Sequence, residues 1–357
     1  MNILLVFPKS VFLSAPMVWP PLGLWYLAAQ LEAQGHHTEF MDMSANDTLP
    51  ADGEYDQLWV SAKSPQAHEI NKIAEHTKDW TKTTTVLGGA AAWVSPHKYA
   101  DMFDLVVRGE GDHPDTIKDI LYPFLPKNSI YIPELHYTLD WVLPPIRKWS
   151  HQYHSYMTSQ DGNTYRMTSM FTTRGCPMSC AFCESGRMGV IWGEQTRYEP
   201  LSIVEHQIKE ILDLGFTGIA YYDDVFILNK RRTLEMLNLH KKYGNVPWRC
   251  FMRSDILHKQ GGKEYLQQMK EAGLIEIFIG IESASNEIKN NIHKGTTIEQ
   301  DTNVVTWCKD LGITCKTSFI LGLPGESEES IQKTKDWILK VRPTIVQIDR
   351  LIPFPGT

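Results

Sequence analysis

Three cysteines stand close together near the middle of the chain, at Cys176, Cys180 and Cys183. Their CxxxCxxC spacing can bring soft thiolates to three corners of a cubane iron–sulfur cluster and leave the fourth iron without a protein ligand. A cluster with four cysteine ligands would normally only transfer electrons, whereas an open iron can also bind a substrate. The spacing therefore predicts a [4Fe–4S] cluster with one open coordination position.

A structural zinc site is the main alternative for these cysteines. Zinc sites usually pair one CxxC with a second CxxC or with a pair of histidines. The remaining cysteines, Cys250, Cys308 and Cys315, are isolated and fall inside apolar runs. The cysteine pattern thus favours the iron–sulfur cluster.

The cysteine motif resembles that of the radical S-adenosylmethionine (SAM) enzymes, and Phe182, directly before the third cysteine, extends the resemblance. The resemblance implies that SAM binds the open iron and that Phe182 lies against its adenine. It also implies that the reduced cluster cleaves SAM to methionine and a 5′-deoxyadenosyl radical, which takes hydrogen from an unactivated carbon. A reducing partner such as flavodoxin or ferredoxin would supply the electron.

Composition restricts the class of protein. The chain has 357 residues, of which 42% are hydrophobic and 22% charged, as in a globular protein long enough for two domains. A formal charge of −7 gives no general field for polyanions, so nucleic acid is not an expected partner. No apolar run reaches the ~18 residues needed to cross a bilayer, and no signal peptide is recognisable, so we expect a cytoplasmic protein without a membrane partner.

The first 125 residues alternate between apolar strands and amphipathic helices. Strands are expected at residues 2–7, 38–43, 57–62, 84–87 and 104–107, with helices at 22–34 and 67–80. This alternation predicts an α/β domain at 1–125 with a doubly wound, Rossmann-like parallel sheet, which holds ligands at the carboxyl ends of its strands.

Glycine-bearing loops follow three of these strands and allow a large ligand to approach the backbone. Together they resemble the loops of the cobalamin-binding domain that precedes the radical SAM core in one large subfamily, although Asp112 stands where that pattern has Glu. The resemblance implies that cobalamin contacts Pro21, Leu22, Gly23, Gly88, Gly89, Gly109, Glu110 and Gly111.

The chain lacks the DxHxxG signature that places a histidine under cobalt in mutase-type cobalamin domains. The resemblance therefore implies a cobalt without histidine ligation, which favours methyl transfer. A domain that has lost cobalamin is an open alternative.

Residues 126–165 contain several prolines and no sustained period, so they are expected to form a linker. Strand–helix alternation resumes in 166–357, with strands expected at 169–173, 218–222, 248–252, 276–281, 314–320 and 344–351. Six such units predict a partial (β/α)6, TIM-type radical SAM barrel with its site at the carboxyl ends of the strands.

Acidic residues follow two of the expected barrel strands. The resemblance implies that Asp223 or Asp224, together with Glu282 and the adjacent Ser283, binds the amino group or ribose of SAM. One of the aspartates could instead cap the next helix. Each charge-assisted contact should contribute about 1.5–3 kcal/mol to SAM binding.

Two further strand ends carry candidate SAM ligands. Arg253 could hold the SAM carboxylate or pair with Asp255, and the sequence leaves both open. The resemblance implies that a turn with Gly322, Pro324 and Gly325 lets backbone amides approach the adenine.

The resemblance implies a cobalamin-dependent methyltransferase that acts on an unactivated carbon of a small-molecule or peptide substrate, with a [4Fe–4S] cluster, SAM and cobalamin as cofactors. A radical SAM enzyme of this lineage that catalyses a rearrangement, cyclisation or oxidation is one alternative. A non-enzymatic iron–sulfur redox or sensor protein is another. Methylthiotransfer to tRNA is disfavoured, because no cysteine precedes Cys176 to hold a second cluster.

Overall fold

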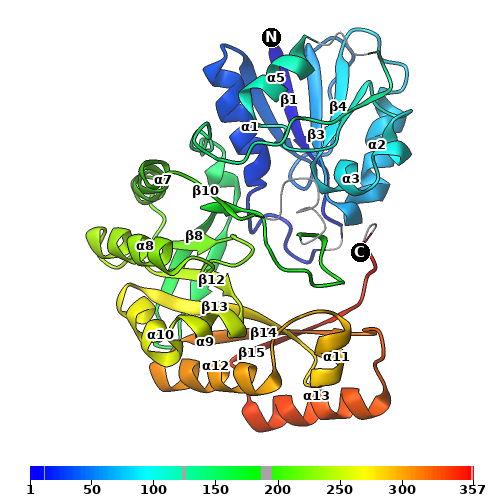
Figure 1. Ribbon diagram of the computed structural model, residues 1–357. Helices are drawn as coiled ribbons and strands as arrows, with labels where there is room; N and C mark the ends of the chain where they lie inside the picture. Colours follow the sequence, from blue (N-terminus) through cyan, green and yellow to red (C-terminus); the bar gives the residue numbers. More distant parts are fainter. Residues whose placement is uncertain (12, 123–125, 186–194, 355–356) are drawn as a thin grey trace. The chain divides into compact units, whose positions relative to one another are not determined.

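A computed structural model describes the chain except for residues 12, 123–125, 186–194 and 355–356. The described residues form two compact units (Figure 1). The first unit contains Met1–His154 and Glu199–Gln207, and the second contains nearly all of the remaining residues. The predicted boundary at residue 125 lies outside the described residues. Within the described part of the chain, no helix combines the length and apolar character that a membrane crossing requires.

The first unit is built on a six-stranded sheet in which all neighbouring strands are parallel. The strands are β1 (Asn2–Phe7), β2 (His37–Asp42), β3 (Gln57–Ser61), β4 (Thr84–Gly88), β5 (Leu105–Val107) and β6 (Ser129–Tyr131). Their order, β2-β1-β3-β4-β5-β6, places a switch point between β1 and β3, outside which such folds hold ligands. The doubly wound parallel sheet predicted from the sequence is thus confirmed.

Helices cover both faces of this first sheet (Figure 1). They are α1 (Leu22–Ala33), the 3-10 turn η1 (Ser64–Gln66), α2 (Ala67–Thr77), α3 (Gly89–Val94), α4 (Pro96–Tyr99) and α5 (Pro114–Leu121). Residues 3–7 of β1 are all buried, as expected for a central parallel strand covered on both sides. Three of these helices, α3 to α5, were not predicted from the sequence, because elements of four to eight residues are too short to show a helical period.

The turn from β4 into α3 brings two backbone segments very close together. Gly89 has a φ of +82°, and a Cβ added there would lie 2.7 Å from the carbonyl oxygen of Ala62 and 2.9 Å from Oγ of Ser61. Any other residue would combine a strained conformation with a backbone clash. Gly89 is therefore required by the packing of this turn against the end of β3.

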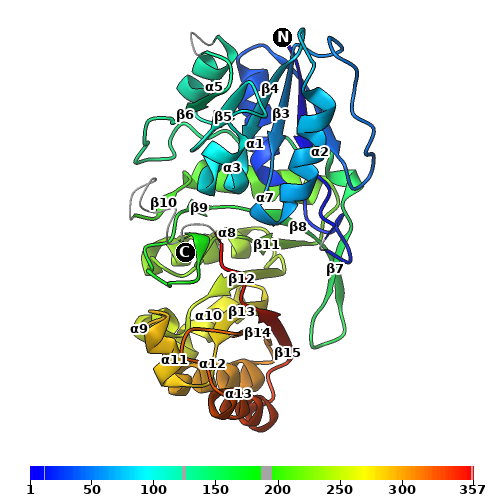
Figure 2. The same cartoon turned by 90° about the vertical axis from the view of Figure 1, so that its right-hand side faces the viewer.

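The second unit contains a seven-stranded sheet that curls into a half-barrel (Figure 2). Its strands are β7 (Ser155–Thr158), β8 (Thr164–Met170), β11 (Gly218–Tyr221), β12 (Trp248–Met252), β13 (Leu274–Glu282), β14 (Thr314–Leu321) and β15 (Ile345–Arg350). The six strands from β8 to β15 are parallel, which confirms the predicted partial barrel. Strand β7 lies within the stretch predicted as a linker and runs antiparallel to β8.

Helices alternate with the strands of the second sheet. They are α7 (Leu201–Asp213), α8 (Lys230–Lys242), α9 (Ser254–Gln260), α10 (Gly262–Glu271), α11 (Asn286–Asn291), α12 (Ile298–Leu311) and α13 (Glu328–Val341). Helix α12 begins with a capping box between Thr297 and Gln300 and ends at Gly312 in the left-handed conformation. Figure 2 shows α10, α12 and α13 along the outer side of the half-barrel, which leaves the inner side to form a site.

We predict that Gly89→Ala lowers the free energy of unfolding of the cofactor-free chain by about 1–3 kcal/mol, because it adds backbone strain and a clash with Ala62. Gly23→Ala is the matched control. A Cβ at Gly23, in the first turn of α1, meets nothing within 4 Å, and alanine is favoured over glycine in a helix. Chemical denaturation of both variants checks this, and equal destabilisation would contradict the packing argument.

Candidate active site

The cysteine loop leaves the half-barrel after β8 and is held by backbone contacts. It begins after the short strand β9 (Thr173–Arg174), which pairs with β10 (Arg197–Tyr198). The amide of Ala181 donates to the carbonyl of Ile292 at 2.9 Å, and the amide of Cys183 donates to the carbonyl of Cys180 at 3.1 Å. The loop that carries the three thiols is thereby tied to the segment that follows α11.

The three cysteines line a cavity of about 200 Å³ at the carboxyl ends of the barrel strands. Phe182 of the cysteine loop and side chains from the later parallel strands and the loops after them complete the wall. Among these side chains are Asp224, Phe251, Arg253, Phe278, Glu282 and Lys294.

The donor set of the cysteine loop fits an iron–sulfur cluster. None of Cys176, Cys180 and Cys183 is in a disulfide, and Cys176 and Cys183 are partly exposed to the cavity. Among the described residues, no three histidine, cysteine or acidic side chains converge on a single metal ion. A cubane does not need such convergence, because each thiolate binds a different iron. Burial raises the pKa of Cys176 to about 11, so cluster binding has to release its proton.

Arg253, directly after β12, is held by three different acceptors. Its Nε and Nη2 donate to the two carboxylate oxygens of Asp255 at 3.1 and 3.3 Å, and Nη2 also donates to the carbonyl of Lys294. Its Nη1 lies 3.4 Å from Sγ of Cys180. Of the two roles that the sequence leaves open for Arg253, the structure contains the pairing with Asp255. The cation therefore also faces the thiol of Cys180.

Glu282 and Lys294 form an ion pair in the cavity wall. Oε1 of Glu282 lies 2.7 Å from Nζ of Lys294, and both side chains are less than one-tenth exposed. Burial lowers the pKa of Lys294, but the Glu282 carboxylate and the Cys180 thiol outweigh this effect and raise it overall. The ammonium also lies over the ring of Phe182, 5.7 Å from its centroid. The predicted acid and the predicted aromatic therefore share one cationic neighbour.

The backbone beneath this ion pair is irregular. The pairing of β13 with β14 shifts register between Gly280 and Glu282, and Glu282 has a φ of +66°, a costly value for a residue with a side chain. A Cβ added at Gly280 would lie 2.1 Å from Oε1 of Glu282 and 2.8 Å from Nζ of Lys294. The bulge thus aims Glu282 into the cavity, and Gly280 provides the space for the ion pair.

The two aspartates after β11 occupy different environments. The carboxylate of Asp223 is buried and accepts hydrogen bonds from the amide and hydroxyl of Thr172 and from the amide of Thr173. It therefore ties the end of β11 to the start of the cysteine loop. Asp224 lines the cavity and accepts from the hydroxyl of Ser185 at 2.8 Å, and burial within the wall raises its pKa.

Ser283 and the turn after β14 lie behind the cavity wall. Ser283 is fully buried, and its hydroxyl accepts from the amide of Ser285 at 3.2 Å. Gly322 and Gly325 have φ values of +92° and +83°, and a Cβ at Gly325 would lie 2.7 Å from the amide nitrogen of the Asn291 side chain. Pro324 is exposed. None of these four residues lines the cavity, although Leu323 between them packs in the same apolar cluster as Phe182.

The glycine loops of the first unit lie at the carboxyl ends of its strands. Pro21, Leu22 and Gly23 begin α1 after the loop from β1; Gly88 and Gly89 join β4 to α3; and Gly109, Glu110 and Gly111 follow β5. The space at two glycines is taken by the protein itself: Gly89 packs on Ala62, and a Cβ at Gly109 would lie 2.7 Å from Pro133. Glu110 is buried. A Cβ at Gly23, Gly88 or Gly111 would meet no protein atom closer than 3.6 Å, so these three leave room beside the backbone.

Comparison with known proteins agrees with both units. The family model of the B12 binding domain matches residues 8–117, and that of the radical SAM superfamily matches residues 170–338. The chain therefore joins a B12 binding domain to a domain of the radical SAM superfamily. These two domains imply a [4Fe–4S] cluster, SAM and cobalamin as cofactors.

Similar proteins include both methyltransferases and an enzyme of another kind. An uncharacterised methyltransferase of Pyrococcus horikoshii is 28% identical, over all of this chain and 82% of its own length. The anaerobic magnesium-protoporphyrin IX monomethyl ester cyclase of Rubrivivax gelatinosus is 26% identical, over 89% of this chain and 62% of its own length. Among solved structures, the radical SAM methyltransferase TsrM from Kitasatospora setae aligns with a TM-score of 0.74, covering 97% of this chain and 72% of its own at 17% identity, which shows a shared fold.

Some side chains around the cavity of this radical SAM enzyme were not expected from the sequence. Phe251 and Phe278 stand two residues before Arg253 and Gly280 on their strands, so the period of two could have placed them on the inner face. Lys294 lies in a loop with no period, and it reaches the site only because α11 returns the chain to the end of β13. No local signal distinguishes it from a surface lysine.

We predict that Asp223 makes the stability of this radical SAM enzyme depend on pH. Burial raises its pKa to about 6, although the bonds from Thr172 and Thr173 act in the opposite direction. Because the folded chain then holds this proton more tightly than the unfolded chain, the contribution of Asp223 to the free energy of unfolding is largest below pH ~4 and falls as the pH rises to ~6.

The measurement is chemical denaturation of the cluster-free chain and of Asp223→Asn, between pH 4 and pH 7. Relative to the variant, the natural chain should lose up to about 3 kcal/mol of unfolding free energy over this interval. Parallel pH profiles for the two proteins would contradict the assignment of a raised pKa to Asp223.

Proposed function

We propose that this chain is a cobalamin-dependent methyltransferase that transfers a methyl group from SAM to an unactivated carbon of a small-molecule or peptide substrate. The observation that carries the proposal is the presence in one chain of a B12 binding domain and of a barrel cavity lined by three cysteines. The similarity to a named methyltransferase along the whole chain supports the transfer of a methyl group.

In this proposal the second unit binds the cluster and SAM. Cys176, Cys180 and Cys183 ligate three irons, and Phe182 lies against the adenine. When bound, the reduced cluster supplies the electron that cleaves SAM, and cobalamin supplies a carrier for the methyl group. The charged side chains of the cavity have the simpler tasks of binding SAM and holding it in one orientation.

The charges around the cavity suit the polar end of SAM. The amino group of SAM is a cation, with which Asp224 and Glu282 can form ion pairs. The carboxylate of SAM is an anion, with which Lys294 and Arg253 can form ion pairs. Glu282 and Lys294 already lie 2.7 Å apart, so binding the two charges of an amino acid exchanges one ion pair for two. The amino and carboxylate groups, whose charges cancel each other, would thereby replace an interaction that Glu282 and Lys294 make with each other.

The inner face below these charges is aromatic. Phe251 and Phe278 contact each other edge to face, with ring centroids 5.1 Å apart, and both line the cavity. In this proposal they exclude water from the reacting atoms, which protects a reactive intermediate from side reactions.

The first unit is proposed to bind cobalamin at the carboxyl ends of β1, β4 and β5. Gly23, Gly88 and Gly111 leave room for a ligand beside the backbone. In the absence of a DxHxxG signature we propose that no histidine of the chain ligates cobalt. A small electron-transfer protein of the flavodoxin or ferredoxin type is proposed as the reductant.

A second candidate function is a cyclisation without methyl transfer. It is favoured by the similarity to the anaerobic cyclase of Rubrivivax gelatinosus over 89% of the chain. The two candidates share the cluster, the SAM site and the cobalamin site, and they differ in the fate of the methyl group.

We predict that replacing Cys176, Cys180 or Cys183 by alanine abolishes the spectrum of the reduced [4Fe–4S] cluster, because each cysteine supplies the only thiolate for one iron. Electron paramagnetic resonance of the anaerobically reconstituted protein is the measurement. Cys308→Ala is the matched control, since Cys308 is a buried thiol of α12 outside the cavity. Loss of the spectrum in that control with the fold intact would overturn the assignment.

For the methyl transfer, the reconstituted protein is given hydroxocobalamin, a chemical reductant, SAM with a ¹³C-labelled methyl group and a deproteinised cell extract of its source organism. We expect about one equivalent of retained cobalamin and a product that carries the label. An unlabelled product formed together with SAM cleavage would instead establish the cyclase-like alternative. Cleavage of SAM without any retained cobalamin would contradict both candidates as stated.

A further inference from the structure

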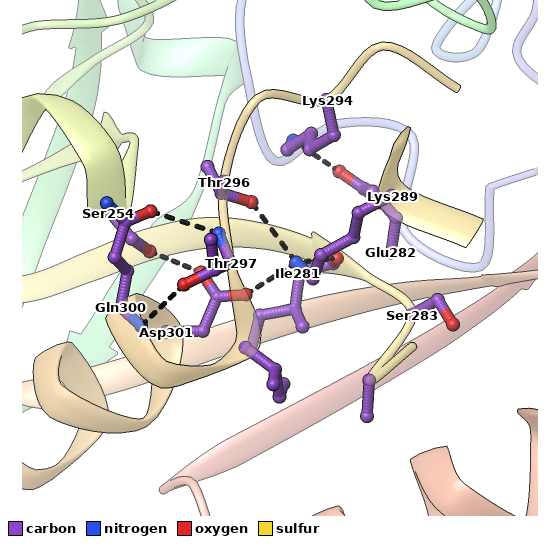
Figure 3. A network of polar contacts seen from close by, with 12 residues as sticks. Ser254, Ile281, Glu282, Ser283, Lys289, Lys294, Thr296, Thr297, Gln300 and Asp301 are labelled. Atoms are coloured by element: carbon purple, nitrogen blue, oxygen red, sulfur yellow. Dashed lines mark hydrogen bonds and ion pairs between the residues drawn. The ribbon is translucent and has the colours of Figure 1, made fainter. Parts of the chain in front are cut away.

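A fully buried lysine lies directly behind the cavity wall. Figure 3 shows Lys289, on α11, among its polar partners, and its side chain has no exposed surface. Its Nζ donates to the carbonyl of Ile281 at 2.7 Å, to Oγ1 of Thr296 at 3.1 Å and to Oδ2 of Asp301 at 2.5 Å. An ammonium has three protons to donate, and here each has its own acceptor.

Asp301 completes the network from the first turn of α12. Its side chain is also fully buried, and its second oxygen, Oδ1, accepts from the hydroxyl of Ser254 at 2.5 Å (Figure 3). The capping box of Thr297 and Gln300 fixes the start of the same helix. Lys289 and Asp301 therefore connect α11, α12, the end of β13 and the start of α9.

Each group that this network anchors is next to a charged residue of the cavity. Ile281 directly precedes Glu282, Ser254 directly follows Arg253, and Thr296 lies two residues after Lys294. The network itself does not line the cavity. It thus fixes the backbone on which Arg253, Glu282 and Lys294 stand, without contacting what they would bind.

Stability alone does not account for a pair of this kind. Burial lowers the pKa of Lys289, and Asp301 has to offset that cost. Buried ion pairs often contribute no more to stability than apolar residues of the same volume. Sites that bind charged ligands, however, need their side chains held to within fractions of an ångström, which is the task of the residues behind them.

We propose that Lys289 and Asp301 are positioning residues that hold Arg253, Glu282 and Lys294 in the geometry that binds SAM. The network sets the affinity for SAM through the backbone at Ile281, Ser254 and Thr296. This proposal rests on the proposed function, in which the cavity binds SAM over the cluster.

The test replaces both members of the pair, Lys289→Met with Asp301→Leu, so that no unpaired charge remains buried. Affinity for SAM is measured on the reconstituted protein by the change that SAM causes in the paramagnetic spectrum of the reduced cluster. We expect the cluster content to be kept and the dissociation constant for SAM to rise by roughly tenfold or more, as for the loss of one charge-assisted contact. The melting temperature is recorded alongside.

Tyr221→Phe is the matched control, because it removes a buried hydrogen bond of the same barrel, 2.7 Å from Tyr221 Oη to His240 Nε2, on the side of the helices. It should lower the melting temperature and leave the affinity for SAM unchanged. Thr296→Val removes one acceptor of Lys289 and preserves the shape of the side chain, so it should weaken SAM binding to a smaller extent. It replaces the double variant in this test if the double variant does not fold.

The outcomes separate the two proposals. If SAM perturbs the cluster of the natural protein and of the double variant at the same concentrations, or if the Tyr221→Phe control weakens SAM binding equally, the positioning role is overturned and the proposed function stands. If SAM does not perturb the cluster of the natural protein, the SAM site fails and the positioning role falls with it.

Discussion

Parallel pairing of the strands is the constraint on which the rest of the structure depends. In each of the two sheets, strands that run in the same direction must end on the same edge, so residues far apart in the sequence meet there. In the half-barrel this edge collects the cysteine loop after β8, Asp224 after β11, Arg253 after β12 and Glu282 at the end of β13. The cavity is a consequence of this shared direction.

A second constraint is the cost of charge at a buried edge. Three oppositely charged pairs lie at or behind this edge: Arg253 with Asp255, Glu282 with Lys294, and Lys289 with Asp301. Because Glu282 and Lys294 already satisfy each other, a ligand with both a cation and an anion can bind them without leaving either unpaired. A ligand with a single charge would pair with either Glu282 or Lys294 and leave the other without an opposite charge.

The sequence predicts those features whose information is local. The spacing of the three cysteines, the alternation of strands and helices, and the acidic strand ends are each contained in a short segment, and the two folds they predict are confirmed by the sheets. The different environments of Asp223 and Asp224 could not be predicted, because adjacent residues differ only in which wall they face. Lys294 could not be predicted either, since its place depends on how α11 returns the chain.

The glycines show the same limit in another form. From the sequence, Gly89 and Gly109 look like openings for a ligand, but the space at each is filled by Ala62 or Pro133 of the protein. A glycine in the sequence indicates that some group lies close to its backbone, but it does not indicate whether that group belongs to a ligand or to the protein.

The reason for a glycine at position 280 differs from that at Gly89, because the backbone of Gly280 lies outside the left-handed region. A Cβ at position 280 is opposed by the oxygen of Glu282 and, less closely, by the nitrogen of Lys294, and by nothing in the backbone geometry. In evolutionary terms, position 280 is coupled to the Glu282 side chain, because a larger residue there would have to displace the carboxylate from its ion pair. A lineage that shortened the side chain at position 282 would remove the closest contact, so positions 280 and 282 should vary together.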